Sequence, residues 1–314
     1  MLIYIAKRLI FVIPVVLAVA LVCFLLVHIT PGDPLVAILP ADASQELSEQ
    51  MRKAYGLDRP LPVQFGLWLW KALNGDLGTS IATGRSVAEE VRRAVGNTVM
   101  LATFAAFIGF VLGLLFGFLA GYFRDTWVDR LVTTIAITGV SMPHYWLGMV
   151  LVIVFSVQLG WLPAVGAGPG GWAWDWEHFR FMILPAVTMS VIPMGIVTRT
   201  VRALVGDLLS HEFVTALRAK VLTEKRVFVH VAKNAAPTAI AVMGLQLGYL
   251  LGGSILIETV FSWPGTGFLL NSAIFQRDLP LLQGTILVLA LFFVVLNLVV
   301  DVIQASIDPR IKRV

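Results

Sequence analysis

Long apolar stretches recur along the chain and set its overall plan. A helix needs about 20 mostly apolar residues to cross the hydrocarbon core of a bilayer. Six stretches reach about that length, and each is bounded by polar or charged residues, which is the pattern of membrane-spanning helices. They lie approximately at residues 9–29, 99–123, 134–159, 183–205, 235–257 and 281–300. The pattern predicts an all-α, polytopic membrane protein with about six transmembrane helices.

Composition excludes a soluble protein of the same length. Apolar residues make up 58% of the 314 residues and charged residues only 13%, whereas about a quarter of a soluble domain is charged. The single cysteine, Cys23, allows no intramolecular disulfide and no cysteine-based metal site. Redox chemistry and a structural zinc ion are therefore not expected.

Positive charges in the short loops predict the orientation. Lys and Arg close to span ends stay on the cytoplasmic side, and they gather before the first span, between spans 2 and 3, between spans 4 and 5, and after span 6. Both termini are therefore expected in the cytoplasm. The predicted organisation is an N-terminal transmembrane helix at 1–30, an extracytoplasmic segment at 31–98, a transmembrane core at 99–305 and a cytoplasmic tail at 306–314.

The extracytoplasmic segment has its own pattern of helices and turns. Residues 45–54 and the amphipathic stretch 63–73 are predicted to be helical, and turns are expected at 56–60 and 75–78. Trp68 and Trp70 favour the headgroup layer. We expect this segment to lie on the outer membrane surface.

Glycine recurs every fourth residue in two spans, at 109, 113, 117 and 121 and again at 244, 248 and 252. Small residues at this spacing allow two helix backbones to approach closely, so tight helix packing is favoured over a ligand site. Pro143, Pro185, Pro193 and Pro237 are expected to kink or end their helices.

Charged residues are missing from the middle of every predicted span, so ion-coupled transport is poorly supported. Uncharged polar residues and one histidine do occur there, and four are candidates for lining a translocation path: Ser141, His144, Gln246 and Tyr249. For each of them, a hydrogen bond to a neighbouring helix is the alternative.

Sequence signatures of catalysis are also missing. The chain has no GxxxxGK[ST] phosphate loop, no HExxH and no GxSxG motif. It is expected to be neither an enzyme nor a metal-binding or nucleotide-binding protein. A secondary carrier or channel, and a scaffold without transport of its own, remain alternatives at this point.

The longest cytoplasmic loop, residues 207–233, contains a short amphipathic pattern. Ser210 is predicted to cap a helix on which Phe213, Ala216, Leu217 and Val221 share one face. Such a helix can lie against lipid headgroups or fit a groove on another protein, and the pattern alone does not choose.

This loop, with the sequence DLLSHEFVTALRAKV at 207–221, resembles the coupling ("EAA") loop of permeases from binding-protein-dependent ABC importers. The dipeptide, oligopeptide and nickel group is the most similar, in particular its B-type permeases. Further matches in the same order are PGDP at 31–34, GLDRPL at 56–61, GDLGTS at 75–80, GLQ at 244–246, ETVFSWPGTG at 258–267, QRD at 276–278 and DPRI at 308–311.

The resemblance implies a type I ABC importer permease fold in a bacterial inner membrane and transport of short peptides or a related small solute. It also implies three kinds of partner, which are a second homologous permease, two ABC ATPase subunits that carry ATP-Mg, and an extracytoplasmic binding protein. The residues that it assigns to ATPase coupling are Glu212, Phe213, Thr215, Ala216, Leu217, Arg218, Lys220 and Val221. Val221 stands where the family usually has glycine, so we expect that the helix continues through it or that the turn lies elsewhere.

Overall fold

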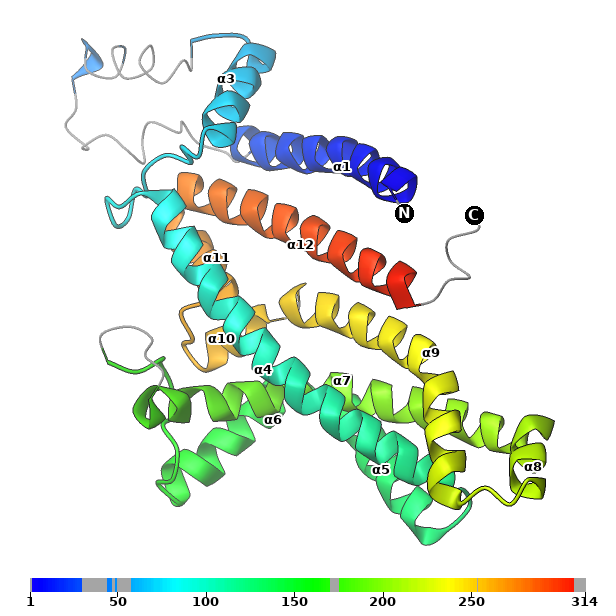
Figure 1. Ribbon diagram of the computed structural model, residues 1–314. Coiled ribbons are helices and arrows are strands. Elements are labelled where there is room, and N and C mark those ends of the chain that lie inside the picture. Colours follow the sequence, from blue (N-terminus) through cyan, green and yellow to red (C-terminus); the bar gives the residue numbers. More distant parts are fainter. Residues whose placement is uncertain are drawn as a thin grey trace. The chain divides into compact units, whose positions relative to one another are not determined.

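The computed structural model describes residues 2–29, 44–46, 49, 58–169, 175–252 and 254–307 (Figure 1). Within these residues the regular elements are helices, and β-pairing is limited to an isolated bridge between Thr79 and Ser86. The predicted all-α class is confirmed. Two compact units are found, one of Met1–Asn97 with Pro264–Val295 and one of Thr98–Trp263 with Leu296–Val314, and they are described separately.

Helices cover the predicted apolar stretches, and several of them extend beyond these stretches. Their bounds are α1 Leu2–Ile29, α3 Leu61–Leu73, α4 Val87–Tyr122, α5 Trp127–Ser141, α6 His144–Leu151, the π-helix η2 Val152–Gln158, α7 Trp176–Ser210, α8 Glu212–Ala219, α9 Glu224–Gly252, α10 Ile255–Val260, α11 Thr266–Gln276 and α12 Leu279–Ile307. Four of them, α4, α7, α9 and α12, are long and apolar enough to cross a membrane. They cover predicted spans 2, 4, 5 and 6, although α9 ends at Gly252 and the final residues of predicted span 5 belong to the separate α10.

Predicted span 3 is not one continuous helix. α5 and the α6–η2 pair meet at 101°, and together they count as one broken span or a re-entrant loop. Pro143 favours the break because it has no backbone N–H and disfavours the helical conformation for the residue before it. Met142 accordingly adopts an extended conformation with φ −81° and ψ 137°.

The first unit joins the N-terminal helix to α12. Predicted span 1 falls in α1, whose apolar part Val12–Leu25 is shorter than a typical span. α1 and α12 line a common hollow through Val16, Val19, Leu287, Ala290, Leu291 and Val294. The predicted amphipathic helix 63–73 is confirmed as α3. In this helix the ring centroid of Phe65 lies 5.4 Å from the ring centroid of Phe24 in α1. The predicted helix at 45–54 lies mostly outside the described residues.

A buried carboxylate organises the loop before α4. Asp278 is fully buried and accepts hydrogen bonds from the Ser80 hydroxyl at 2.5 Å and from the backbone N–H groups of Ala82 and Leu281, both at 3.1 Å. Upstream, Gly75 and Gly78 adopt positive φ, which confirms the predicted turn. α4 begins at Val87, well before the predicted start of its span, so the end of the predicted extracytoplasmic segment is helical.

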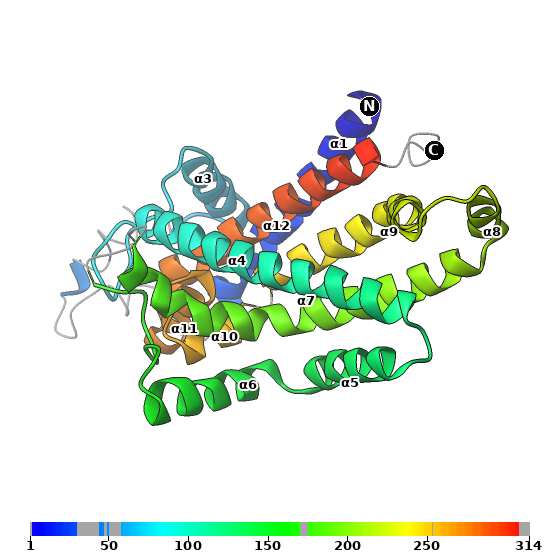
Figure 2. The ribbon, with the colours of Figure 1, turned by 60° about the horizontal axis from the view of Figure 1, so that its bottom comes forward.

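The second unit is built on close packing of α4 against α7 (Figure 2). A Cβ atom added at Gly117 would lie 2.6 Å from the Cβ of Val201 and 2.9 Å from the carbonyl oxygen of Thr198. Gly109, Gly113 and Gly121 approach the same helix as closely. The prediction that this glycine stripe serves helix packing is therefore confirmed.

Candidate functional site

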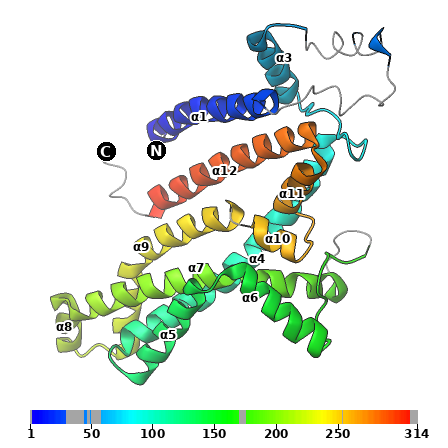
Figure 3. The ribbon, with the colours of Figure 1, turned by 180° about the vertical axis from the view of Figure 1, so that it is seen from behind.

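Three helices meet at a corner formed by the C-terminal end of α7, the short helix α8 and the N-terminal end of α9 (Figure 3). The predicted cap by Ser210 is wrong. Ser210 is the last residue of α7, and its hydroxyl donates to the Asp207 carbonyl at 2.6 Å. His211, extended at φ −72° and ψ 147°, separates the two helices and stands at the N-cap of α8. The chain therefore changes direction one residue later than predicted.

One face of α8 belongs to the hydrophobic core of the second unit. Val214 is completely buried, and Phe213 and Leu217 pack against the same cluster. That cluster contains Val205 of α7 and Val227 of α9. The predicted apolar face is correct for Phe213 and Leu217, wrong for Val221, which is exposed beyond the end of α8, and it missed Val214. The core therefore holds α8 against both neighbouring helices.

The opposite face of α8 is exposed and consists of small or polar residues. Glu212, Thr215, Ala216 and Ala219 are all exposed, and their spacing of three, four and seven residues places them on one side of the helix. Ala216 was predicted on the apolar face, and this is wrong. The short side chains on this face allow another protein to approach the helix backbone closely.

The turn after α8 passes through Val221, in contrast to both expectations. The helix ends at Ala219, and Val221 adopts the left-handed conformation with φ 58° while 89% of its surface is exposed. Its N–H donates to the Arg218 carbonyl at 2.9 Å, and the N–H of Leu222 donates to the Leu217 carbonyl at 3.3 Å. These two bonds form a Schellman motif, in which glycine is usual at the left-handed position.

Polar side chains cross-link the same corner. The Arg218 guanidinium donates to both carboxylate oxygens of Glu224, at 3.0 and 3.2 Å. The Tyr122 hydroxyl, on the last residue of α4, donates to Glu224 at 2.7 Å. The hydrogen bonds to Glu224 raise the pKa of Arg218 above its already high usual value, so the pair stays charged. Arg218, predicted as a coupling residue, thus has a partner within this chain.

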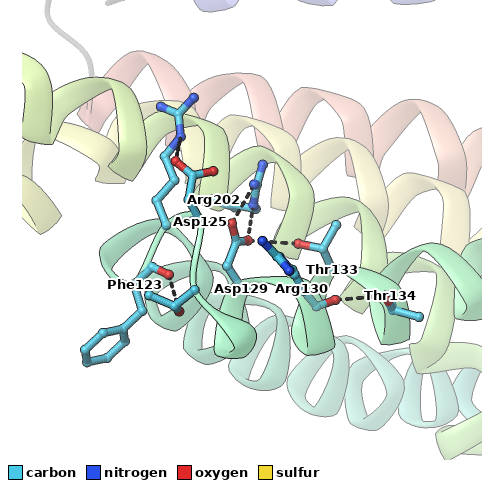
Figure 4. Close-up of polar contacts among 9 residues, drawn as sticks. Phe123, Asp125, Asp129, Arg130, Thr133, Thr134 and Arg202 are labelled. Carbon is cyan, nitrogen blue, oxygen red and sulfur yellow. Dashed lines mark hydrogen bonds and ion pairs between the residues drawn. The ribbon is translucent and has the colours of Figure 1, made fainter.

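A second ion pair joins α5 to α7 (Figure 4). Arg202 donates to both oxygens of the buried Asp129 carboxylate, with the Nη2 contact at 2.8 Å. Asp129 also accepts from the Asp125 N–H at 2.9 Å and from the Thr133 hydroxyl at 3.1 Å. Four donors satisfy this carboxylate, so its burial does not leave an isolated charge.

Sequence reasoning missed the roles of Tyr122, Glu224 and Asp129. Tyr122 and Glu224 are 102 residues apart along the chain, and Asp129 and Arg202 are 73 residues apart, although Glu224 and Asp129 also have partners four to six residues away. Acidic residues beside basic residues in loops that were predicted to be cytoplasmic were the available signal, because an acid there has cations nearby to bind.

The predicted path residues are only partly brought together. His144 and Tyr249 line one small hollow with Met189, Ile192, Leu250 and Ile257. Ser141 is exposed at the end of α5, on the other side of the break at Pro143. The side-chain oxygen of Gln246, one turn before Tyr249 in α9, is buried and finds no hydrogen-bond donor within the described part of the chain.

Comparisons with known proteins agree with this architecture. Residues 113–313 match the family described as "Binding-protein-dependent transport system inner membrane component", and residues 1–90 match the N-terminal family of the same systems. The chain is 41% identical over 313 residues to the "Glutathione transport system permease protein GsiC" of Salmonella paratyphi A, and the alignment covers 99% of both chains. The protein of the same name from Escherichia coli K12 shows the same identity and coverage.

Among solved structures, the inward-facing MetNI methionine ABC transporter has the same fold. Its TM-score is 0.57 at 19% sequence identity, over 69% of this chain and 96% of the MetNI chain. Importers of this kind also contain separate ATPase subunits and a substrate-binding protein. The chain therefore belongs to the family of binding-protein-dependent transport system inner membrane components, as a multi-pass permease subunit of a bacterial ABC importer.

Proposed function

We propose that the exposed face of α8 is the surface on which an ABC ATPase subunit docks. The two-sided character of this helix carries the proposal. Val214 and its neighbours anchor α8 in the core of the second unit, while Glu212, Thr215 and Ala216 remain available to a partner. Because the anchored face cannot slide freely, a push on the exposed face moves α7 and α9 with it.

The coupling residues then divide into two groups. Glu212, Thr215, Ala216, Lys220 and Val221 are exposed and suit direct contact with the ATPase. Phe213 and Leu217 face the core and support the helix. ATP-Mg binds to the partner ATPases, and its binding and hydrolysis shift the permease between two orientations of its helices.

A second homologous permease completes the translocation path. The hollow lined by His144 and Tyr249 belongs to this path, with Ser141 and Gln246 contributing polar groups. The buried, unpaired oxygen of Gln246 suits a donor from the other permease, from water or from the solute. The solute is a short peptide or a related small molecule, and glutathione is a specific candidate because the permeases named above belong to glutathione systems.

Topology follows from the charge distribution. Both termini and the α8 corner lie in the cytoplasm, and residues 31–98 lie outside, where they contact the binding protein. The basic residues of α9 near this corner, Lys225, Arg226 and Lys233, are exposed and agree with this assignment. The domain boundaries at 30, 98 and 305 are part of the same proposal.

The docking face is tested by introducing bulk and charge at its centre. The tagged chain is co-expressed with its transport partners, extracted in mild detergent and purified, and the co-purifying ATPase is quantified. Ala216→Arg is expected to abolish ATPase recovery, because a long side chain separates the surfaces that the alanine lets meet. Ala82→Arg, at another exposed alanine outside this corner, is the matched control. Normal ATPase recovery with Ala216→Arg would reject α8 as the docking helix.

A further inference from the structure

Among the polar contacts that α4 makes within the second unit, two lie near the ends of its part in that unit. At its C-terminal end, the Tyr122 hydroxyl donates to Glu224 at 2.7 Å, and Glu224 in turn holds Arg218 of α8. The part of α4 that belongs to the second unit begins at Thr98. There the Thr98 hydroxyl donates to the carboxylate of Glu258 in α10 at 2.8 Å. Thr98 is 3% exposed and Glu258 is fully buried.

The helix between these contacts is uninterrupted and firmly packed. α4 runs without a break from Val87 to Tyr122, so Thr98 and Tyr122 are separated by roughly 36 Å at 1.5 Å per residue. This distance exceeds the hydrocarbon core of a bilayer, which is about 30 Å thick. The glycine contacts with α7 bring the backbones together along the same stretch, which leaves α4 little freedom to bend.

We propose that α4 is a strut that carries the displacement of the docking helix to α10. The Arg218–Glu224–Tyr122 network is the connection at the α8 end, and the Thr98–Glu258 hydrogen bond is the connection at the other end. This inference rests on the proposed docking role of α8. It assigns Tyr122, Glu224 and Thr98 as positioning residues for transport, and it makes Arg218 an internal connector instead of an ATPase contact.

Charge and geometry support the connection at α8. Arg218 uses two donors on two carboxylate oxygens, an arrangement that fixes the direction of the pair and is stronger than a single contact. The turn between the two residues is short and contains the left-handed Val221, so it does not constrain α8 as a continuous helix would. The ion pair bridges this turn, and Tyr122 extends the bridge to α4.

The test uses the complete importer reconstituted in proteoliposomes, with solute uptake and ATP hydrolysis measured together. Tyr122→Phe removes only the hydroxyl, and Tyr145→Phe, at an exposed tyrosine of α6, is the matched control. We expect Tyr122→Phe to keep normal ATPase binding but to lower the solute transported per ATP at least about twofold, since one net hydrogen bond changes an equilibrium by roughly two- to tenfold. Unchanged transport per ATP in Tyr122→Phe would overturn the proposal.

A charge exchange separates an internal connector from an ATPase contact. Arg218→Glu alone is expected to reduce transport per ATP because two acids then face each other. Adding Glu224→Arg is expected to restore at least about half of the loss, since the opposite charges meet again in reversed order. If Arg218 instead contacted the ATPase, the second substitution would not rescue the first, and that result would reject its assignment here.

The other end of the strut has its own matched pair. Thr98→Val removes the donor to Glu258 at nearly constant volume, and Thr98→Ser keeps it. We expect Thr98→Val to lower the solute transported per ATP and Thr98→Ser to leave it unchanged. An equal loss of transport per ATP in both variants would overturn this half of the proposal. Failure of the proposed function looks different, because the Ala216→Arg variant would then still recover the ATPase.

Discussion

The left-handed Val221 predicts an unusual result, namely that replacing a β-branched residue by glycine stabilises this protein. A residue with a Cβ atom in the left-handed region costs roughly 1–2 kcal/mol relative to glycine. Glycine gives the unfolded chain more freedom, which costs roughly 0.5–1 kcal/mol. Because Val221 is 89% exposed, its side chain contributes little packing that the substitution would remove. The expected net gain for Val221→Gly is about 0.5–1 kcal/mol.

Thermal unfolding of the purified chain in one detergent, at one scan rate, is the assay. A gain of this size corresponds to about 1–3 °C in a chain of this length. Val165→Gly is the matched control, because Val165 lies in a loop, is 51% exposed and is not in the positive-φ region. At Val165 glycine relieves no left-handed strain and only increases the freedom of the unfolded chain. The unfolding midpoint of Val165→Gly is therefore expected to fall by about as much as that of Val221→Gly rises. Val221→Asn is expected to lie between valine and glycine, since asparagine tolerates the left-handed region.

The reasoning is refuted if Val221→Gly lowers the midpoint as much as Val165→Gly does. That outcome would mean that the turn after α8 does not require a left-handed residue. A rise in stability together with a severe loss of transport would support the geometry and show that the valine side chain itself is needed by a partner.

Three other substitutions test the packing and the buried polar groups. Gly117→Ala is expected to destabilise the chain by about 1–3 kcal/mol, seen as a lower unfolding midpoint, whereas Gly66→Ala in α3, where a Cβ meets nothing within 4 Å, should not. Asp129→Asn leaves the charge of Arg202 uncompensated and is expected to lower the free energy of unfolding by roughly 2–3 kcal/mol. An unfolding midpoint equal to that of the native chain would contradict this expectation. Ser80→Ala removes a donor to a buried carboxylate, and we expect about 1–2 kcal/mol less protection of that loop in hydrogen exchange.

Local patterns were sufficient for much of the fold. Apolar stretches of about 20 residues located α4, α7, α9 and α12, because crossing a bilayer demands that length and hydrophobicity within one segment. The amphipathic helix α3 was likewise predicted from its own residues. The bend after α5 was partly foreseen, since Pro143 indicates a break, but its angle of 101° depends on the helices packed around it.

The corner around α8 shows where local patterns fail. Propensity rules excluded Val221 from a left-handed turn, yet the turn forms there because Leu217 and Leu222 on either side pack against the same cluster. A strain of roughly 1–2 kcal/mol is offset by the partial burial of these two side chains. The burial of Val214 instead of Ala216 has the same origin, because the positions of α7 and α9 decide which face of α8 is covered.

The sequence by itself determined the all-α membrane class, the positions of the long helices, the family and the location of the proposed docking helix. These properties depend on hydrophobicity and on motifs that are contiguous along the chain. Only the tertiary structure decided that Tyr122 meets Glu224 and that Asp129 meets Arg202, since these partners are 102 and 73 residues apart. A hydrogen bond acts over about 3 Å, so such pairs exist only after the helices have packed.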